Sequence, residues 1–293
     1  MSLQSTLASG RFVLTAEITP PVSVDPADLM KKAEPMKGLA DAVNVTDSAS
    51  ARAALDPVAA AAILVQNGLE PILQLTARDR NRIALQAALL GAHALGVRNV
   101  TFMTGDDPTK GDQPDAKPVF DYDSSALAGL AVRMRDTGEL PSGRKIGGKV
   151  EFFVGATDAP VDPPADWEPK GLRKKIESGA QFLQTQFCMD AGVAGRYVAK
   201  LREKGITTPL LFGVVPYLSL KQAQWIKSNL FGSIIPDAHI ARMEAAADPK
   251  AEGVAICVDY LRELQGTPGI AGAHIMAPLN EASIAEVLRR MRA

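Results

Sequence analysis

Cysteine, histidine and aromatic residues are scarce in this chain. Among 293 residues there are two cysteines, three histidines and 5% aromatic side chains. Cys188 and Cys257 lie far apart in apolar segments and form no CxxC pair. We therefore expect no structural zinc, no iron–sulfur cluster and no other metal site in this chain. Two isolated buried thiols are typical of a protein that works in a reducing cytosol.

The chain also lacks an excess of charge of either sign and a long apolar run. Its 32 basic and 33 acidic residues give a formal net charge of −1, and no basic stripe is interleaved with aromatics, which argues against nucleic-acid binding. The longest apolar stretch, around residues 59–65, is too short to cross a bilayer. The first residues show no pattern of a signal peptide, so we expect a cytoplasmic protein without membrane attachment.

Glycine-rich phosphate-binding motifs are absent as well. The first predicted strand-to-helix turn reads AEITPPVS, no GxGxxG follows any predicted strand, and no GxxxxGK[ST] occurs. An open, doubly wound sheet usually carries a glycine-rich turn at its first strand. The sequence therefore disfavours that architecture.

What the chain does have is a regular alternation of strand-like and helix-like segments. Eight strands are predicted at 12–18, 41–46, 70–76, 97–104, 149–155, 181–187, 209–215 and 270–276. Helical segments are predicted at 26–38, 56–67, 80–95, 123–137, 169–178, 191–204, 220–229, 236–263 and 281–291. Eight such units match a closed parallel barrel. The predicted fold class is α/β, a (β/α)₈ TIM barrel formed by residues 1–293 as a single domain.

Polar residues gather at the predicted carboxyl ends of the strands, where a TIM barrel carries its active site. This ring of hydrogen-bonding groups suits a flat, nitrogen-rich ligand such as a pterin or a flavin. Its members are Glu17, Asn44, Thr46, Asp47, Gln74, Thr76, Thr104, Gly105, Asp106, Gly155, Ala156, Gln184, Gln186 and Gln222.

Several of these residues also have a structural interpretation. Glu17 could lie on the solvated face of its strand, and Asp106 could cap a turn. Gln184 and Gln186 share one face of their strand, and inside a barrel they would need polar partners. The remaining candidates are interpreted as structural side chains in helical or apolar surroundings: His93, His239 and His274.

Seven motifs taken together resemble methylenetetrahydrofolate reductase of the bacterial type. They occur in the family's order and span nearly the whole chain. The motifs are TAEITPP (15–21), AVNVTD (42–47), QLTARDRNR (74–82), GVRNVTFMTGDDP (96–108), FLQTQFCMD (182–190), GVVPYLSLKQA (213–223) and AHIMAPLNE (273–281).

The resemblance implies a flavoprotein oxidoreductase of one-carbon metabolism and methionine biosynthesis. It would reduce 5,10-methylenetetrahydrofolate to 5-methyltetrahydrofolate in a ping-pong reaction, with FAD (FMN as the alternative) and NADH or NADPH. Glu17 and Asp106 would be catalytic, with Glu17 the acid that opens the methylene bridge. The flavin would be lined by Thr46, Asp47, Gln74, Thr104, Gly105, Asp106, Ala156, Lys174 and Lys175. Substrate contacts would be Asp106, Gln186 and Gln222.

Two departures from the family pattern leave alternatives open. Gln74 and Glu281 stand where many bacterial members have His and Arg, and that Arg is expected to meet the folate tail. QLTARDRNR and HIMA are closer to reductases of acetogenic bacteria, some of which work with an iron–sulfur partner subunit. The alternatives are a partner-dependent or flavin-independent reductase, a pterin-dependent methyltransferase barrel and a non-catalytic barrel subunit. The retained Glu17 and Asp106 argue against the last of these. We also expect a homo-oligomer.

Overall fold

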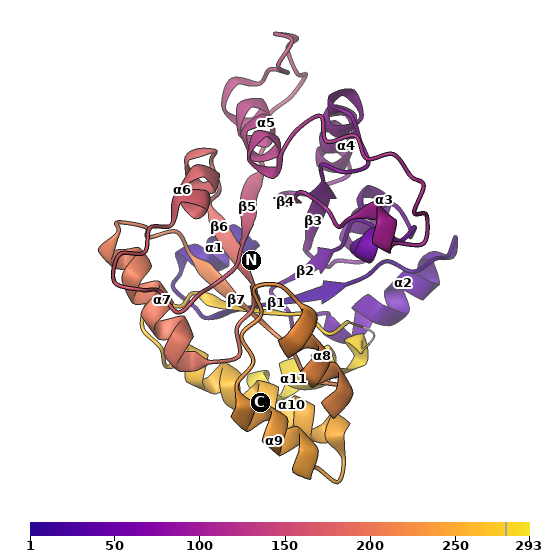
Figure 1. The fold of residues 1–293 in the computed structure, drawn as a ribbon. Helices are drawn as coiled ribbons and strands as arrows, with labels where there is room; N and C mark the ends of the chain where they lie inside the picture. Colours follow the sequence, from indigo (N-terminus) through magenta and orange to yellow (C-terminus); the bar gives the residue numbers. More distant parts are fainter. Residues whose placement is uncertain (279) are drawn as a thin grey trace.

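Eight parallel strands close into a barrel at the centre of the computed structural model, which describes residues 1–278 and 280–293 (Figure 1). Each strand pairs with the next one along the chain, and β8 pairs with β1. The strands are β1 Val13–Ile18, β2 Ala42–Val45, β3 Pro71–Thr76, β4 Asn99–Met103, β5 Phe153–Asp158, β6 Phe182–Phe187, β7 Leu210–Val214 and β8 Gly272–Ile275. The predicted (β/α)₈ barrel is confirmed.

Helices surround the barrel (Figure 1). The α-helices are α1 Leu3–Ala8, α2 Pro26–Ala33, α3 Pro57–Gln66, α4 Arg82–Ala94, α5 Ser124–Thr137, α6 Lys170–Glu177, α7 Ala191–Glu203, α8 Leu220–Asn229, α9 Asp237–Ala245, α10 Pro249–Gln265 and α11 Glu281–Arg292. Short 3₁₀ turns are η1 Glu34–Met36, η2 Ala49–Ala51 and η3 Pro108–Lys110. Within the described ranges, no helix is both long enough and apolar enough to cross a membrane.

Most of these helices begin where a short polar side chain accepts a hydrogen bond from a backbone N–H of the first turn. The capping residues are Ser2, Asp25, Asp56, Asn81, Asp123, Asp190, Ser219 and Asp248. The predicted helical region 236–263 divides into α9 and α10 for this reason. Asp248 caps α10 and Pro249 occupies its first position, which separates the two helices.

Strand β5 lies further along the chain than predicted. The apolar run at 149–155 suggested a strand that ends at Gly155 and Ala156, but the strand ends at Asp158. Phe152 is buried outside the barrel strands, and its ring lies nearly perpendicular to the His93 ring at a centroid distance of 5.4 Å. An apolar run can thus be buried in the helix layer as well as in the sheet, and periodicity alone does not distinguish the two.

The unpredicted helix α1 closes the floor of the barrel. Leu3 is fully buried, and its backbone N–H donates to the Glu70 carboxylate at 2.6 Å. The apolar cluster at this end consists of Leu3, Val13, Ala42, Ile72, Phe153, Phe182 and Leu211. At this end buried Asn99 donates to the Glu70 carboxylate at 3.0 Å. Other buried polar side chains of the interior, such as Thr15, Asn44, Gln184 and His274, lie above the floor, toward the carboxyl ends of the strands.

Candidate active site

Polar side chains fill the barrel interior above its apolar floor. Thr15, Asn44, Gln184 and His274 are each at most 3% exposed. Asn44 and Gln184 exchange two hydrogen bonds, of 2.7 and 2.9 Å, and Gln184 Nε2 also donates to Thr15 Oγ1 at 3.2 Å. Gln184 therefore has the partners that a buried amide requires. These partners hold the Gln184 amide in the barrel interior.

Glu17 lies above this layer, at the mouth of the barrel. Its side chain is 20% exposed. Oε2 accepts a hydrogen bond from Gln74 Nε2 at 2.8 Å and faces His274 Nε2 at 3.4 Å. The structure thus brings two sequence-predicted residues into direct contact. Because both contacts are made by one carboxyl oxygen, the other oxygen is left for a ligand.

The turn after β4 requires glycine. Gly105 has a φ of +99°, and a Cβ at this position would lie 2.9 Å from Cβ of Arg78 and 3.1 Å from Cβ of Thr76. Thr104 and Asp106 on either side of it are exposed. This close approach lets the backbone of the β4 loop pack directly on the end of β3.

Asp106 lies against the loop after β2. Its Oδ2 accepts a hydrogen bond from the backbone N–H of Ser50 at 2.7 Å. Ser48, Ser50 and Ala51 in that loop all have positive φ, between 48° and 57°. Buried Arg78 supports the arrangement by donating to the carbonyls of Ser48 and Asp106, at 3.2 and 3.1 Å. Strained non-glycine residues of this kind concentrate at ligand-binding loops.

Two buried oxygens at the end of β2 have no hydrogen-bond partner among the described residues. They are Thr46 Oγ1 and Asp47 Oδ1. The other oxygen of Asp47 is well satisfied, because it accepts from Thr76 N at 2.8 Å, Thr76 Oγ1 at 3.0 Å and Arg80 at 2.7 Å. Unpaired buried oxygens are costly, and a ligand edge with hydrogen-bonding groups would satisfy them.

The two candidate lysines of α6 point to different places. Lys175 is half-buried and donates to the carbonyl of Thr157 at 2.5 Å, near the end of β5 and close to buried Ala156. The Lys174 side chain is 65% exposed and pairs with Asp123 at 3.0 Å, at the start of α5. Only Lys175 is directed toward the strand ends.

The two glutamines predicted to contact substrate both form hydrogen bonds with backbone groups. Gln186 is half-buried, and its Oε1 accepts from the N–H of Phe187 at 2.9 Å, where the register between β6 and β7 shifts. Gln222 accepts from the N–H of Leu218 at 2.7 Å and donates to the carbonyl of Pro278 at 3.1 Å. Gln222 thereby joins the loops that follow β7 and β8.

Glu281 is compensated within the chain. Its carboxylate pairs with Lys32 of α2 at 2.8 Å, and Lys32 also donates to the carbonyl of Thr19 at 3.0 Å. The acidic residue that replaces the expected Arg is therefore part of a contact between α2 and the start of α11. This contact lies on the same side of the barrel as the end of β1.

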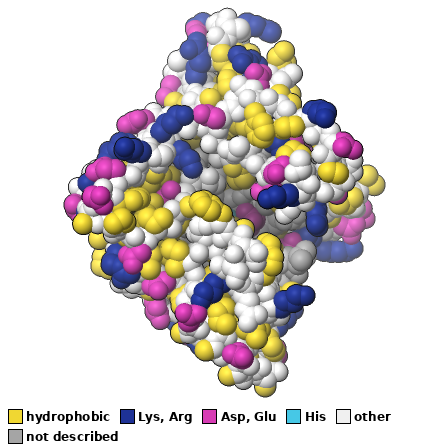
Figure 2. Space-filling view, in the orientation of Figure 1, with side chains coloured by type: hydrophobic (Ala, Val, Ile, Leu, Met, Phe, Trp, Pro, Cys, Tyr) yellow, Lys and Arg dark blue, Asp and Glu magenta, His cyan; other side chains and the backbone are white. Residues whose placement is uncertain are grey.

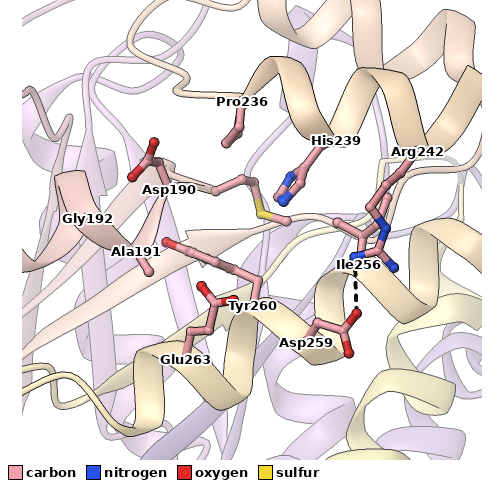
Figure 3. A pocket seen from close by; sticks show the side chains of 11 residues that line it. Asp190, Ala191, Gly192, Pro236, His239, Arg242, Ile256, Asp259, Tyr260 and Glu263 are labelled. Carbon is pink, nitrogen blue, oxygen red and sulfur yellow. Dashed lines mark hydrogen bonds and ion pairs between the residues drawn. The ribbon is translucent and has the colours of Figure 1, made fainter.

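A separate cavity of about 230 Å³ lies in the helix layer, lined by residues of α7, α9 and α10 (Figure 3). Arg242 on its wall pairs with Asp259 and Glu252, and the His239 ring is 3.3 Å from the Tyr217 hydroxyl. Burial lowers the pKa of His239. The polar side chains of this cavity thus have partners on neighbouring elements. The hollow seen in Figure 2 is a different one and lies near the centre of the barrel face.

His274, which the sequence predicts to be a structural residue, contacts both Thr15 and Glu17 in the folded chain. The signal was present in the period of two along β8. His274 is the register partner of Thr15, so its side chain faces the same interior. The described residues include no group of three or more His, Cys, Asp and Glu side chains placed to hold a metal ion.

Comparison with known proteins gives a family for this geometry. The family model described as methylenetetrahydrofolate reductase matches residues 2–292. The chain belongs to the methylenetetrahydrofolate reductase family. It is 24% identical over 235 residues to methylenetetrahydrofolate reductase 1 of Schizosaccharomyces pombe, covering 76% of this chain and 36% of that protein. It is 25% identical over 240 residues to a probable methylenetetrahydrofolate reductase (NADPH) of Caenorhabditis elegans, covering 79% of this chain and 34% of that protein.

The chain thus spans about a third of the length of these curated relatives of the methylenetetrahydrofolate reductase family. Among solved structures, a Clostridium thermocellum protein described as binding two copies of 5-methyl-5,6,7,8-tetrahydrofolic acid superposes with a TM-score of 0.65. It is 15% identical, and the match covers 99% of this chain and 97% of that chain. At this identity the likeness supports the shared barrel fold. The place of the chain in an acetogen-like branch stays a prediction.

Proposed function

We propose that this chain reduces 5,10-methylenetetrahydrofolate to 5-methyltetrahydrofolate with a hydride that comes from NADH or NADPH. Family membership supports the reaction. The observation that carries the proposal is the Glu17 carboxyl at the barrel mouth, held through one oxygen by Gln74 and His274. A carboxyl so placed can act as a general acid toward a ligand that covers the mouth.

The reaction needs one proton and one hydride. In the folate, the methylene carbon bridges two nitrogens. Protonation of the less basic, aryl-substituted nitrogen by Glu17 breaks its bond to the methylene carbon and leaves an iminium on the other nitrogen. A hydride then adds to that carbon and gives the methyl group. The sum is one methylenefolate, one NAD(P)H and one proton, converted to one methylfolate and one NAD(P)⁺.

A flavin fits the residues at the strand ends. Thr46 and Asp47 offer buried oxygens without partners in the described parts of the chain, and Gly105 brings the backbone close to the end of β3. We therefore propose that FAD, with FMN as the alternative, is held by the groups near Thr46, Asp47, Gln74, Thr104, Gly105, Asp106 and Ala156, with Lys175 rather than Lys174 near a phosphate. The bound flavin supplies hydride transfer between a nicotinamide and a folate that bind in turn.

The substrate contacts are proposed at Asp106, Gln186 and Gln222. Gln222 is hydrogen-bonded to the loop after β8. Its side chain is thereby held in place and could position a substrate group that contacts Gln222. Asp106 lies on the rim beside the strained loop after β2. A folate above Glu17 would be within the ring formed by these loops.

The purified protein tests this function directly. The protein should show flavin absorbance at ~450 nm, and NADH or NADPH should bleach this absorbance in the absence of oxygen. Addition of methylenetetrahydrofolate should then give methyltetrahydrofolate. Reduction by dyes but by neither nicotinamide would favour the partner-dependent reductase. A colourless protein that turns over methylenefolate with a nicotinamide would favour the flavin-independent one. No methyltetrahydrofolate with any of these reductants would overturn the proposed function.

A further inference from the structure

A continuous chain of hydrogen bonds crosses the barrel interior and ends at Glu17. It starts with the Asn44–Gln184 amide pair and continues through Thr15 to His274, whose Nδ1 is 3.0 Å from Thr15 Oγ1. Thr15 and Glu17 are two residues apart on β1 and so face the same interior. His274 on the neighbouring strand is the register partner of Thr15. Its imidazole therefore bridges the two β1 side chains.

The donors in this chain favour one position for the ring hydrogen of His274. Gln184 Nε2 donates to both Asn44 and Thr15, so the Thr15 oxygen acts as an acceptor there. The hydroxyl hydrogen of Thr15 then remains for His274 Nδ1 at 3.0 Å, in preference to the Ala273 carbonyl at 3.4 Å. With the hydroxyl hydrogen directed at Nδ1, that nitrogen would be the acceptor and the ring hydrogen would be on Nε2, the atom that faces Glu17.

The two carboxyl oxygens of Glu17 therefore differ in the number of hydrogen-bond donors that they meet. Gln74 Nε2 and His274 Nε2 both point at Oε2, at 2.8 and 3.4 Å. An oxygen that accepts from two donors is a poor place for the acid hydrogen. The proton of the carboxylic acid therefore belongs on Oε1, the oxygen left for a ligand at the mouth.

We propose that His274 is a positioning residue for the acid: oriented by Thr15, its ring holds Oε2 of Glu17 through Nε2, so that the proton is carried on Oε1, the oxygen left for the folate. This inference rests on the proposed function of Glu17. It assigns His274 and Thr15 to the folate half-reaction only, because hydride transfer from a nicotinamide needs no proton from Glu17.

The experiment compares variants of the full chain in anaerobic stopped-flow measurements of each half-reaction. His274→Leu should slow reduction of methylenetetrahydrofolate by about 10- to 100-fold, the effect of losing one hydrogen bond to a group that is charged in one of its states. The donor half-reaction should stay within a few-fold of wild type. His274→Gln, which keeps a donor near the position of Nε2, should recover most of the lost rate.

A second pair of variants tests the orientation of the ring. Thr15→Val removes the hydroxyl that fixes the tautomer and should slow the folate half-reaction, whereas Thr15→Ser should restore it. The matched control is Thr101→Val. Thr101 is a fully buried hydroxyl on β4, in register with Gln74, and it has no partner among the described residues. This control should change neither half-reaction.

The outcomes separate this inference from the proposed function. If Glu17→Gln leaves the folate half-reaction intact, the proposed acid is wrong and the role of His274 falls with it. If Glu17→Gln is slow but His274→Leu is as fast as wild type, this inference alone is overturned. Equal slowing of both half-reactions by His274→Leu, with no recovery in His274→Gln, would show a merely structural histidine. In the Glu17→Gln background, His274→Leu should have no further effect, since the two act as one unit.

Discussion

At the scale of single residues, the proposed role of the Glu17 carboxyl predicts different effects on the two proposed half-reactions. Glu17→Gln keeps the size of the side chain and an acceptor for Gln74, but it cannot supply a proton. Loss of a positioned general acid costs about 10²- to 10⁴-fold. We expect the folate half-reaction to fall by that factor, while flavin content and reduction by the nicotinamide stay within a few-fold of wild type. Anaerobic stopped-flow on each half-reaction is the measurement, and a parallel fall in both would make Glu17 a structural or flavin-anchoring residue.

At the scale of elements, the end of β4 depends on a glycine with a left-handed backbone. Gly105→Ala should lower the free energy of unfolding by about 1–3 kcal/mol, because the added methyl group would approach Arg78 and Thr76 closely. The control is Gly129→Ala in α5. Gly129 has helical neighbours and open space around its Cα, so this change should raise stability by about 0.5–1 kcal/mol. Urea unfolding measures both, and equal effects would contradict the assigned turn.

The contact between β5 and α7 makes the stability of the molecule depend on pH. The Asp158 carboxyl accepts from the Tyr197 hydroxyl at 2.5 Å, and burial raises the pKa of Asp158 above its ordinary value. The folded state therefore keeps this proton to higher pH than the unfolded state. As pH rises from the ordinary pKa of an aspartic acid toward the raised pKa of Asp158, the wild-type protein loses stability. Asp158→Asn has no titrating group at this position and so does not lose that stability.

Urea unfolding between about pH 4 and pH 8 tests that contact. The free energy of unfolding of Asp158→Asn, minus that of wild type, should increase as pH rises. Asp162→Asn is the control of opposite sign, because hydrogen bonding to Arg196 lowers the pKa of exposed Asp162. That variant should lose a little stability relative to wild type over the same range. A flat profile for Asp158→Asn would mean that its carboxyl is not desolvated.

At the scale of the whole molecule, helix α1 separates the apolar floor from solvent without touching the mouth. Leu3→Ala should lower the free energy of unfolding by about 2–5 kcal/mol, since it leaves a cavity at a fully buried position. Leu95→Ala, at a side chain that is 47% exposed, should change stability by less than about 0.5 kcal/mol. Neither should alter the rate of either half-reaction. A slower folate half-reaction in folded Leu3→Ala would mean that floor and mouth are coupled.

The sequence by itself determined the order of elements and most of the strand ends. Strand and helix periods are local properties, and Asp or Ser caps and stop signals such as Gly68 and Gly96 mark boundaries within a few residues. Together with the count of eight strand–helix units, these patterns predict Glu17, Gln74 and Gly105 at one face of the barrel. The bounds of β5 were wrong, because burial of Phe152 in the helix layer gives the same apolar pattern as burial in a strand.

Only the tertiary structure decided which polar side chains meet. Closing the barrel brings His274 of the last strand beside Thr15 and Glu17 of the first, although His274 and Glu17 are 257 positions apart in the sequence. It also directs Lys175, not Lys174, to the strand ends. A residue's chemical type and local period are present in the sequence. Its partner across the barrel depends on strand register and closure, which are set by packing of the whole core and have no local signature.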